Sequence, residues 1–312
     1  MSSQPPILPS NQSPLGALPA RFRRQRILLV GCGDIGLRVA RLLPPHVALL
    51  ALTSSAARVT ALRQAGVVPL LGNLDDPASL RRLAGLATRV LHLAPPSPQG
   101  WADLRTRDLT RVLLRRSGPA ALVYASTSGV YGDCAGAWVT ESRATRADTP
   151  RARRRVDAER SVRFFGRARG VRSSILRIPG IYAPNRAGGT PRQRLERGTP
   201  VLREEDDVYT NHIHADDLAR ACVAALWRGR AQRVYNVADD TRLKMGDYFD
   251  LAADLYGLPR PARVARGTAE HELPLSLLSF MSESRRLDNM RLKRELRLVL
   301  RFPTVHSGLV TP

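Results

Sequence analysis

A short apolar run that passes directly into a glycine-rich turn constrains this chain more than any other feature. Residues 27–30 (ILLV) are typical of a buried strand, and residues 31–36 form a G-x-G-x-x-G turn. A helical pattern follows at once and is ended by the prolines at 44 and 45. Its predicted apolar face consists of Ile35, Val39, Leu42 and Leu43. This order of elements predicts a nucleotide-binding βαβ unit; the alternative is a glycine-rich turn that binds nothing.

Each glycine of the turn has a physical role in binding a dinucleotide. Gly31 permits the tight turn, Gly33 lets a pyrophosphate approach the backbone, and Gly36 lets the helix pack closely on the strand. The helix then begins at Asp34 and Ile35, where free N–H groups and a partial positive charge favour phosphate. We therefore predict a cofactor site at Gly31, Gly33, Asp34, Ile35 and Gly36.

The end of the second predicted strand indicates which dinucleotide is preferred. A fold that prefers NAD usually carries Asp or Glu there, about 20 residues after the glycines, to bind the ribose 2′-hydroxyl. Here residues 47–52 are followed by Thr53, Ser54 and Ser55, and Arg58 comes shortly after. A guanidinium suits a 2′-phosphate, so NADP(H) is the predicted cofactor and NAD(H) the alternative. Arg58 as an ordinary surface arginine is the competing interpretation.

The charge of the chain is extreme, but its distribution argues against a dedicated nucleic-acid site. The formal net charge is +22 over 312 residues, and of 49 basic residues only Lys244 and Lys293 are lysines. The arginines are scattered over most segments and few aromatic residues lie among them. Arginine in place of lysine is a compositional trend and does not by itself indicate a binding site. We therefore expect no dedicated nucleic-acid site, and a small-molecule substrate as the partner.

Cysteine usage and hydropathy place the protein in the cytoplasm. The three cysteines are widely spaced without a C-x-x-C pair, which favours a reducing compartment and no metal site. No apolar stretch approaches the roughly 18 residues of a membrane span, so no membrane association is predicted. Residues 1–25 are rich in Pro, Ser and Gln and are predicted to be a flexible tail rather than a signal peptide.

Strands alternate with helices along most of the chain, which predicts an α/β fold with a doubly wound, Rossmann-like parallel sheet. The regular pattern ends near residue 181. We predict a Rossmann domain at 26–181 and a smaller substrate-binding region at 182–312, partly interleaved with it. Beyond the first two strands, the predicted strands are 67–71, 89–94, 120–125, 173–178, 208–213 and 233–237. The other predicted helices begin at Asp76 or span 102–116, 151–168 and 217–227.

Six segments, taken together, resemble the extended short-chain dehydrogenase/reductase superfamily in its NAD-dependent epimerase/dehydratase branch. They lie in the expected order over roughly residues 26–240. The resemblance implies an NAD(P)-dependent oxidoreductase, epimerase or dehydratase that acts on a carbonyl or sugar-nucleotide-type substrate and is often a homodimer. The segments are 31–36, 72–76 (GNLDD), 91–94 (LHLA), 124–132 (YASTSGVYG), 176–184 (LRIPGIYAP) and 212–218 (HIHADDL).

The resemblance assigns roles to particular residues. It places Asn73 and Leu74 beside the adenine, although the family usually has Asp in place of Asn73. Thr127, with Ser126 next to it, falls at the catalytic Ser or Thr that hydrogen-bonds the substrate. The cofactor backbone and nicotinamide would be lined by Leu93, Ala94, Pro95, Pro179, Gly180 and Ile181.

The chain departs from the family at the proton donor, a Tyr followed four residues later by Lys. An alignment on Glu159 puts Arg151 at the Tyr position and Arg155 at the Lys position, and none of the seven tyrosines has a Lys four residues later. A guanidinium stays protonated and cannot act as acid or base. The chain thus resembles atypical members of the superfamily, with Tyr131 or a bound water as candidate proton donors.

Two functions follow from this departure. The first is an enzyme with non-standard proton transfer; the second is an inert NADP sensor similar to the NmrA-like branch, acting through a protein partner. The basic run at 151–155 is either an anion-binding patch or a solvated helix face. The set His212, His214, Asp216 and Asp217 resembles metal ligands, but we favour a strand end whose Asp caps the next helix.

Overall fold

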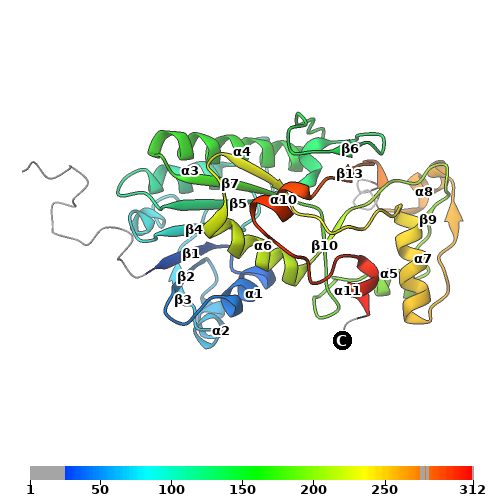
Figure 1. The fold of residues 1–312 in the computed structure, drawn as a ribbon, viewed down its shortest axis with the longest axis horizontal. Helices are drawn as coiled ribbons and strands as arrows, with labels where there is room; N and C mark the ends of the chain where they lie inside the picture. The colour runs from blue at the N-terminus through cyan, green and yellow to red at the C-terminus, as the bar shows by residue number, and fades with distance from the viewer. Residues whose placement is uncertain (1–24, 275–277, 279–280, 311–312) are drawn as a thin grey trace, which may run out of the picture.

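Seven parallel strands form the central sheet of the computed structural model, which describes residues 25–274, 278 and 281–310. The strands lie in the spatial order β3-β2-β1-β4-β5-β7-β11, so the chain builds the sheet outward from β1 in one direction and from β4 in the other, as in a dinucleotide-binding fold. The predicted doubly wound parallel sheet is therefore confirmed (Figure 1). The strands are β1 (Arg26–Val30), β2 (Ala48–Thr53), β3 (Val68–Leu71), β4 (Arg89–His92), β5 (Ala121–Thr127), β7 (Arg172–Ile178) and β11 (Arg233–Asn236).

The inner strands are apolar on both faces because helices cover both. In β1, Ile27 and Leu29 point into the apolar layer under one pair of helices, while Leu28 and Val30 point into the layer under the other pair. This alternation explains why residues 27–30 form an unbroken apolar run. The first pair is α1 (Asp34–Leu42) and α6 (Ala215–Arg228), and the second is α3 (Leu104–Leu113) and α4 (Pro150–Arg169).

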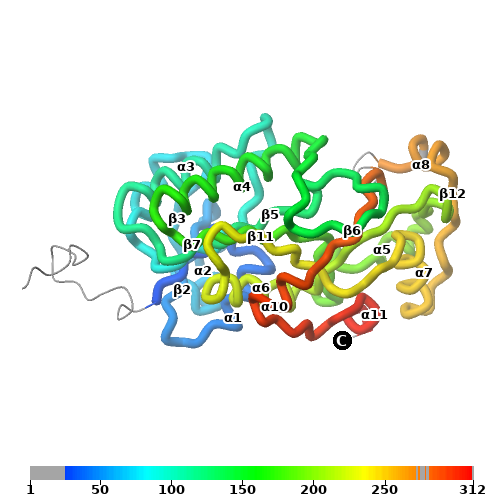
Figure 2. The backbone as a smooth tube through the Cα atoms, turned by 45° about the horizontal axis from the view of Figure 1, so that its top comes forward, coloured from blue at the N-terminus to red at the C-terminus, as the bar shows by residue number. Residues whose placement is uncertain are grey.

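A third apolar cluster lies at the opposite end of the molecule from β2 and β3 (Figures 1 and 2). It is built around α7, with Tyr248, Phe249 and Ala252 buried. Its elements are β8 (Gly180–Tyr182), α5 (Arg192–Glu196), β9 (Val201–Leu202), β10 (His212–His214), α7 (Met245–Tyr256), β12 (Arg263–Val264), α8 (Arg266–Glu272) and α11 (Val305–Leu309). Within the described ranges, no helix has the length and apolar character needed to cross a bilayer.

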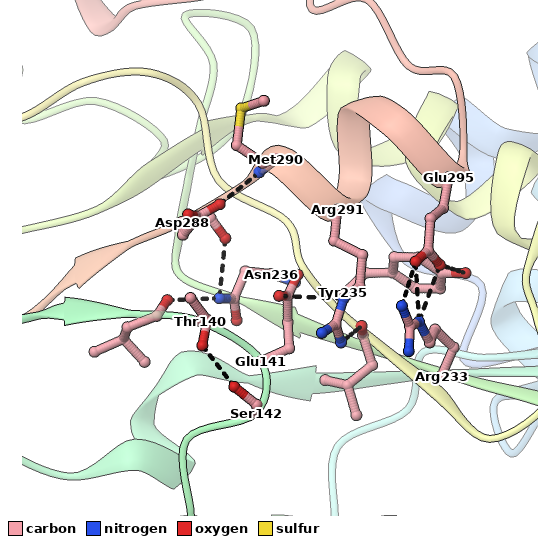
Figure 3. A network of polar contacts seen from close by, with 12 residues as sticks. Thr140, Glu141, Ser142, Arg233, Tyr235, Asn236, Asp288, Met290, Arg291 and Glu295 are labelled. Carbon is pink, nitrogen blue, oxygen red and sulfur yellow. Dashed lines mark hydrogen bonds and ion pairs between the residues drawn. The ribbon is translucent and has the colours of Figure 1, made fainter.

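A polar network fastens the last part of the chain to the edge of the sheet (Figure 3). The Asn236 side chain donates to the carbonyl oxygens of Val139 (2.9 Å) and Asp288 (3.1 Å), so it joins β11, β6 (Trp138–Val139) and the segment after β13 (Arg286–Leu287). Arg233 on β11 also pairs with Glu295, the last residue of α10 (Met290–Glu295). The C-terminal segment is therefore held against the Rossmann sheet by hydrogen bonds of the buried Asn236 side chain and by a partly exposed ion pair.

Three local predictions were wrong. The helix predicted to open at Asp76 is a series of turns, followed by the short 3₁₀ helix η3 (Arg81–Leu83). Side chains compete with helical hydrogen bonds there, because Asp76 Oδ1 accepts from the Ala78 N–H and Ser79 Oγ donates to the Asp76 carbonyl. The strand predicted at 208–213 is confined to β10. Leu42 was predicted to lie on the apolar face of the first helix, but it is 40% exposed because α1 ends at that residue.

Shorter helices complete the Rossmann part. η2 (Ala56–Arg58) and α2 (Val59–Gln64) connect β2 to β3, and η4 (Ser128–Tyr131) follows β5 directly. The η4 turn carries the chain from the hydroxyl cluster at the end of β5 into a small fourth apolar cluster, in which Val130 and Tyr131 are buried with Leu287 of β13. It therefore places Thr127 where the sheet meets the C-terminal region.

Candidate cofactor and substrate site

A cavity of about 560 Å³ opens at the carboxyl ends of the central strands, and we call it the cofactor cavity. It lies at the switch point between β1 and β4, where open α/β sheets bind their ligands. The predicted residues that line it are Gly31, Gly33, Asp34, Ile35, Gly36, Thr53, Ser54, Arg58, Asn73, Leu74, Leu93, Ala94, Pro95, Pro179 and Ile181. The structure therefore gathers these residues from five separate segments at one edge of the sheet.

The geometry of the glycine turn fits a pyrophosphate. Gly31 has φ of +90°, and a Cβ on it would lie 2.6 Å from the Ala94 backbone nitrogen, so a side chain is excluded there. Gly33 has φ of −82°, and a Cβ on it would meet no protein atom within 4 Å. The backbone at Gly33 thus faces open space beside the N-terminus of α1, whose first N–H groups lack helical partners.

The far end of the cofactor cavity, after β2, carries hydroxyls and a cation. Thr53 ends β2 with Ser54 beside it, and the Arg58 guanidinium lies over the glycine turn, where Nη2 donates to the Cys32 carbonyl (2.6 Å). Among the described residues that line this cavity, Asp34 is the carboxylate, and it pairs with Arg38 at 3.0 Å. No acidic side chain therefore lies at the described end of β2 to repel a 2′-phosphate.

A second cavity of about 480 Å³ adjoins the first, and we call it the substrate cavity. It extends from the end of β5 to α5 and α7 in the third apolar cluster. Several residues line both cavities, so the two cavities meet at a shared stretch of wall. The shared residues are Thr127, Arg151, Pro179, Ile181 and Arg186.

The two hydroxyls at the end of β5 have different surroundings. Ser126 is buried, and its Oγ donates to Glu159 Oε1 (2.7 Å). Glu159 in turn accepts from Arg177 Nε (3.1 Å) and Nη2 (2.8 Å), and both charged side chains are 4% exposed. Thr127 Oγ1 accepts from the Gly129 N–H (3.3 Å), which leaves its own hydroxyl hydrogen free to donate into the cavities.

Arg151 and Arg155 lie on the first two turns of α4 and line the cofactor cavity. Arg155 Nη1 donates to the Ala125 carbonyl (2.7 Å) and to the Tyr124 hydroxyl (3.1 Å), so it fixes the end of β5. Arg151 lines both cavities. Two cations thus line the cofactor cavity together with Thr127.

The basic run at 151–155 does not form a single anion-binding patch. Arg153 stacks on the Trp101 ring at 4.8 Å and Nε donates to the Ala147 carbonyl (3.1 Å), while Arg154 Nη1 donates to the Gly100 carbonyl (2.7 Å). These two residues turn away from the cavities because successive helix positions face different directions. Only the first and last arginines of the run face the cofactor cavity.

Two predicted site residues lie elsewhere. Tyr131 is completely buried, its hydroxyl donates to Asn236 Oδ1 (2.7 Å), and it lines neither cavity. Burial also raises the pKa of its phenol, which opposes proton release. The prediction that Tyr131 is a proton donor is therefore wrong. Gly180, predicted beside the nicotinamide, lines the substrate cavity but not the cofactor cavity.

The predicted role of the Asp residues after β10 as helix caps was also wrong. The cap of α6 is His214, whose Nδ1 accepts from the Asp216 N–H (3.2 Å). Asp217 is buried and instead accepts from the N–H groups of Arg301 (3.0 Å) and Phe302 (2.8 Å). Across the described residues, no three His, Cys, Asp or Glu side chains are grouped to hold a metal ion.

Two charged residues of the substrate cavity were not predicted from the sequence. Glu283 and Arg194 come from segments without a recognisable motif, and both line the cavity. A Cβ on Gly129 would lie 3.7 Å from Thr127 Oγ1 and 3.9 Å from Glu283 Oε2, so both oxygens lie close to Gly129. No signal in the sequence brings residue 283 to the end of β5, because the contact depends on the return of the C-terminal segment.

Solved structures share this architecture. A conserved protein of unknown function from Silicibacter pomeroyi is 28% identical, with a TM-score of 0.77 over 91% of this chain and 96% of that one. UDP-glucose 4-epimerase from Thermotoga maritima is 20% identical, with a TM-score of 0.71 over 92% and 96% of the two chains. A dTDP-glucose 4,6-dehydratase from Streptomyces venezuelae is 21% identical, with a TM-score of 0.73 over 92% and 95%.

The two enzymes share the fold at identities too low to indicate more than that, and no curated protein sequence matches this chain. The sequence itself decides the family. The family model described as "NAD dependent epimerase/dehydratase family" matches residues 27–238, which is more than half of the chain and includes both the glycine turn and the segment at Thr127. This protein therefore belongs to the NAD-dependent epimerase/dehydratase family.

Proposed function

We propose that the protein is an NADP(H)-dependent oxidoreductase or epimerase/dehydratase that acts on a carbonyl or hydroxyl group of a small molecule. The observation that carries this proposal is the contact between the two cavities at Thr127 and Arg151. The nicotinamide, when bound, supplies or accepts the hydride. One structure of similar fold holds UDP-glucose, and another holds NAD together with a second ligand. Both support a sugar-nucleotide-type substrate beside the dinucleotide.

The preference for NADP(H) is supported by the residues after β2. The Thr53 and Ser54 hydroxyls and the Arg58 guanidinium would hold a 2′-phosphate, and the glycine turn would hold the pyrophosphate. Asn73 and Leu74 would contact the adenine, and Leu93 to Pro95 the adjoining ribose and phosphates. Pro179 and Ile181 would lie near the nicotinamide, since they line both cavities.

Thr127 would orient the substrate by donating its hydroxyl hydrogen to the reacting oxygen. Arg155 would hold this end of β5 in place through the Ala125 carbonyl. Arg151 would stabilise negative charge on the substrate oxygen, because a guanidinium beside a developing oxyanion lowers its energy. Neither arginine can move a proton.

We assign the proton transfer to Glu283. Its Oε2 lies close to Gly129, as Thr127 Oγ1 does, and accepts from Arg285 Nη1 (2.7 Å), which orients the carboxylate. Glu283 would accept the proton when a substrate hydroxyl is oxidised and return it when the carbonyl is reduced. This role replaces the missing tyrosine with a carboxylate from the C-terminal segment.

The cofactor part of the proposal is tested by calorimetric titration with NADPH, NADP⁺, NADH and NAD⁺. Gly33→Asp should abolish binding without unfolding the protein, because its Cβ enters open space and its carboxylate repels the pyrophosphate. Gly267→Asp is the matched control, since Gly267 also has open space around a Cβ and lies outside both cavities. Equal binding by wild type and Gly33→Asp would refute the assigned site.

The catalytic part is tested by a turnover screen with carbonyl and sugar-nucleotide substrates. Glu283→Gln should lose turnover and keep cofactor affinity; undiminished turnover would exclude Glu283 as the proton carrier. The sensor remains the second candidate, favoured by Arg151 and Arg155 at the Tyr and Lys positions. Tight cofactor binding with a strong redox preference and no turnover across the screen would select the sensor.

A further inference from the structure

A buried arginine on α1, the helix that follows the glycine turn, contacts two segments outside its own helix. Arg38 lies one turn after Asp34, and only 7% of its surface is exposed. Its guanidinium donates to Asp34 Oδ1 through Nε (3.0 Å), to Asn185 Oδ1 through Nη2 (2.5 Å) and to Asp216 Oδ1 through Nη1. Asn185 belongs to the loop after β8, and Asp216 belongs to the first turn of α6. This one side chain therefore joins the loop to both helices.

The loop that Arg38 contacts, residues 183–189, is a compact unit, and we call it the junction loop. The Ala183 N–H donates to the Gly189 carbonyl (3.1 Å), and the Gly189 N–H donates to the Arg186 carbonyl (2.9 Å). Gly189 has no room for a side chain, because a Cβ on it would lie 2.6 Å from the Ala183 carbonyl oxygen. Ala183 and Gly189 are buried, whereas Asn185 between them is exposed. The internal bonds fix the shape of the loop, so its position depends on the contacts of its side chains.

The junction loop reaches both cavities through Arg186. Arg186 lines the cofactor cavity and the substrate cavity, and its Nη1 lies 3.7 Å from Asp34 Oδ2. That ion pair is long and partly exposed, so it contributes little by itself. Arg38 is buried and donates directly to Asn185, which makes it the stronger link between α1 and the loop.

We propose that Arg38 is a positioning residue that holds the junction loop over the place where the two cavities meet. It acts through Asn185 and keeps Arg186 at the wall that both cavities share. The inference rests on the proposed function in taking the cofactor cavity as a dinucleotide site. It adds that the loop retains the half of the dinucleotide at the junction, while the half beside Arg58 binds independently of the loop.

Calorimetric titration with two ligands of different reach tests this role. NADP⁺ spans the Arg58 end and the junction, whereas adenosine 2′,5′-bisphosphate carries only the half with the 2′-phosphate. Arg38→Met should weaken NADP⁺ about tenfold or more and leave the bisphosphate unchanged, because it removes a charged donor from Asn185. Asn185→Ala alters only an exposed side chain and should weaken NADP⁺ in the same way, with little further loss in the double variant. Arg41→Met is the matched control, since Arg41 is exposed on the same helix and lies outside both cavities.

Trypsin cleavage of the bond between Arg186 and Ala187 tests the same role in the cofactor-free protein. A loop released from Arg38 should be cut faster in Arg38→Met and Asn185→Ala, and at the wild-type rate in Arg41→Met. Equal loss of both ligands in Arg38→Met, unchanged NADP⁺ affinity or unchanged cleavage would each overturn the proposal. If wild type binds no dinucleotide, the proposed function fails, and the cleavage rates alone decide whether Arg38 holds the loop.

Discussion

The buried ion pair between Arg177 and Glu159 offers the sharpest test of how this fold is held together. Arg177→Met keeps an unbranched side chain of similar length on β7 and removes the charge. It leaves the Glu159 carboxylate 4% exposed, with the Ser126 hydroxyl as its remaining hydrogen-bond donor among the described contacts. The variant therefore isolates the cost of one uncompensated charge between α4 and the central sheet.

The size of the effect follows from burial and geometry. Glu159 loses two charge-assisted hydrogen bonds, at 3.1 and 2.8 Å, in a region that water does not reach. Removing one partner of such a pair costs about 3–5 kcal/mol of unfolding free energy. For a protein of this size that corresponds to a fall in melting temperature of roughly 5–8 °C. Adding Glu159→Leu should recover much of the loss, since an apolar pair of similar volume needs no compensation.

Urea unfolding of the cofactor-free protein measures the four members of this double-mutant cycle. Arg260→Met is the matched control, because Arg260 binds Asp254 through the same two nitrogens but both side chains are half exposed or more. Little change is expected there, since solvent screens the pair. A loss in Arg177→Met no larger than that in Arg260→Met would refute the argument from burial.

Three further predictions concern the cofactor cavity and pH. Gly31→Ala should destabilise the protein and abolish nucleotide binding, because its Cβ would lie 2.6 Å from the Ala94 nitrogen; calorimetry and thermal melting check both. Arg58→Gln should weaken NADP⁺ about 10-fold or more and leave NAD⁺ unchanged in the same titration. Burial raises the pKa of Asp239 to about 7, so its neutral form stabilises the fold at low pH and this stability is lost as pH rises from about 4 through 7. Asp239→Asn should remove that loss and be the more stable protein at pH 8. The same pH dependence of the unfolding free energy in both proteins, measured by urea unfolding, would contradict this.

The parts of the fold that sequence predicts well are those whose information is local. The apolar run at 27–30, the glycine turn and the first helix lie within one stretch, and the doubly wound sheet follows from repeats of that pattern. Prediction failed where side chains outcompeted the backbone, as at Asp76, whose carboxylate bonds to the Ala78 N–H. It also failed at Tyr131, because only the return of β11 shows that the phenol is bound by Asn236.

The site divides in the same way. The glycine turn and the end of the second strand follow from the pattern of the first βαβ unit. The remaining residues that line the cofactor cavity, from Asn73 to Ile181, were assigned through the family resemblance. The substrate cavity depends on α5, α7 and the segment around residue 283, whose positions relative to Thr127 are set by packing in the third apolar cluster. Single arginines and glutamates in these segments look like solvated charges in sequence, because 24% of the chain is charged.

Arg151 and Arg155 give the cofactor cavity two permanent cations on the same wall as Thr127. The arginines can hold the strand end and attract an anion, but they cannot carry a proton, so that task requires another residue. Glu283 reaches the substrate cavity from the C-terminal segment and supplies a carboxylate there. Glu283→Gln should therefore lose turnover while NADP⁺ still binds, because the substitution removes the proton acceptor and leaves the cofactor cavity unchanged.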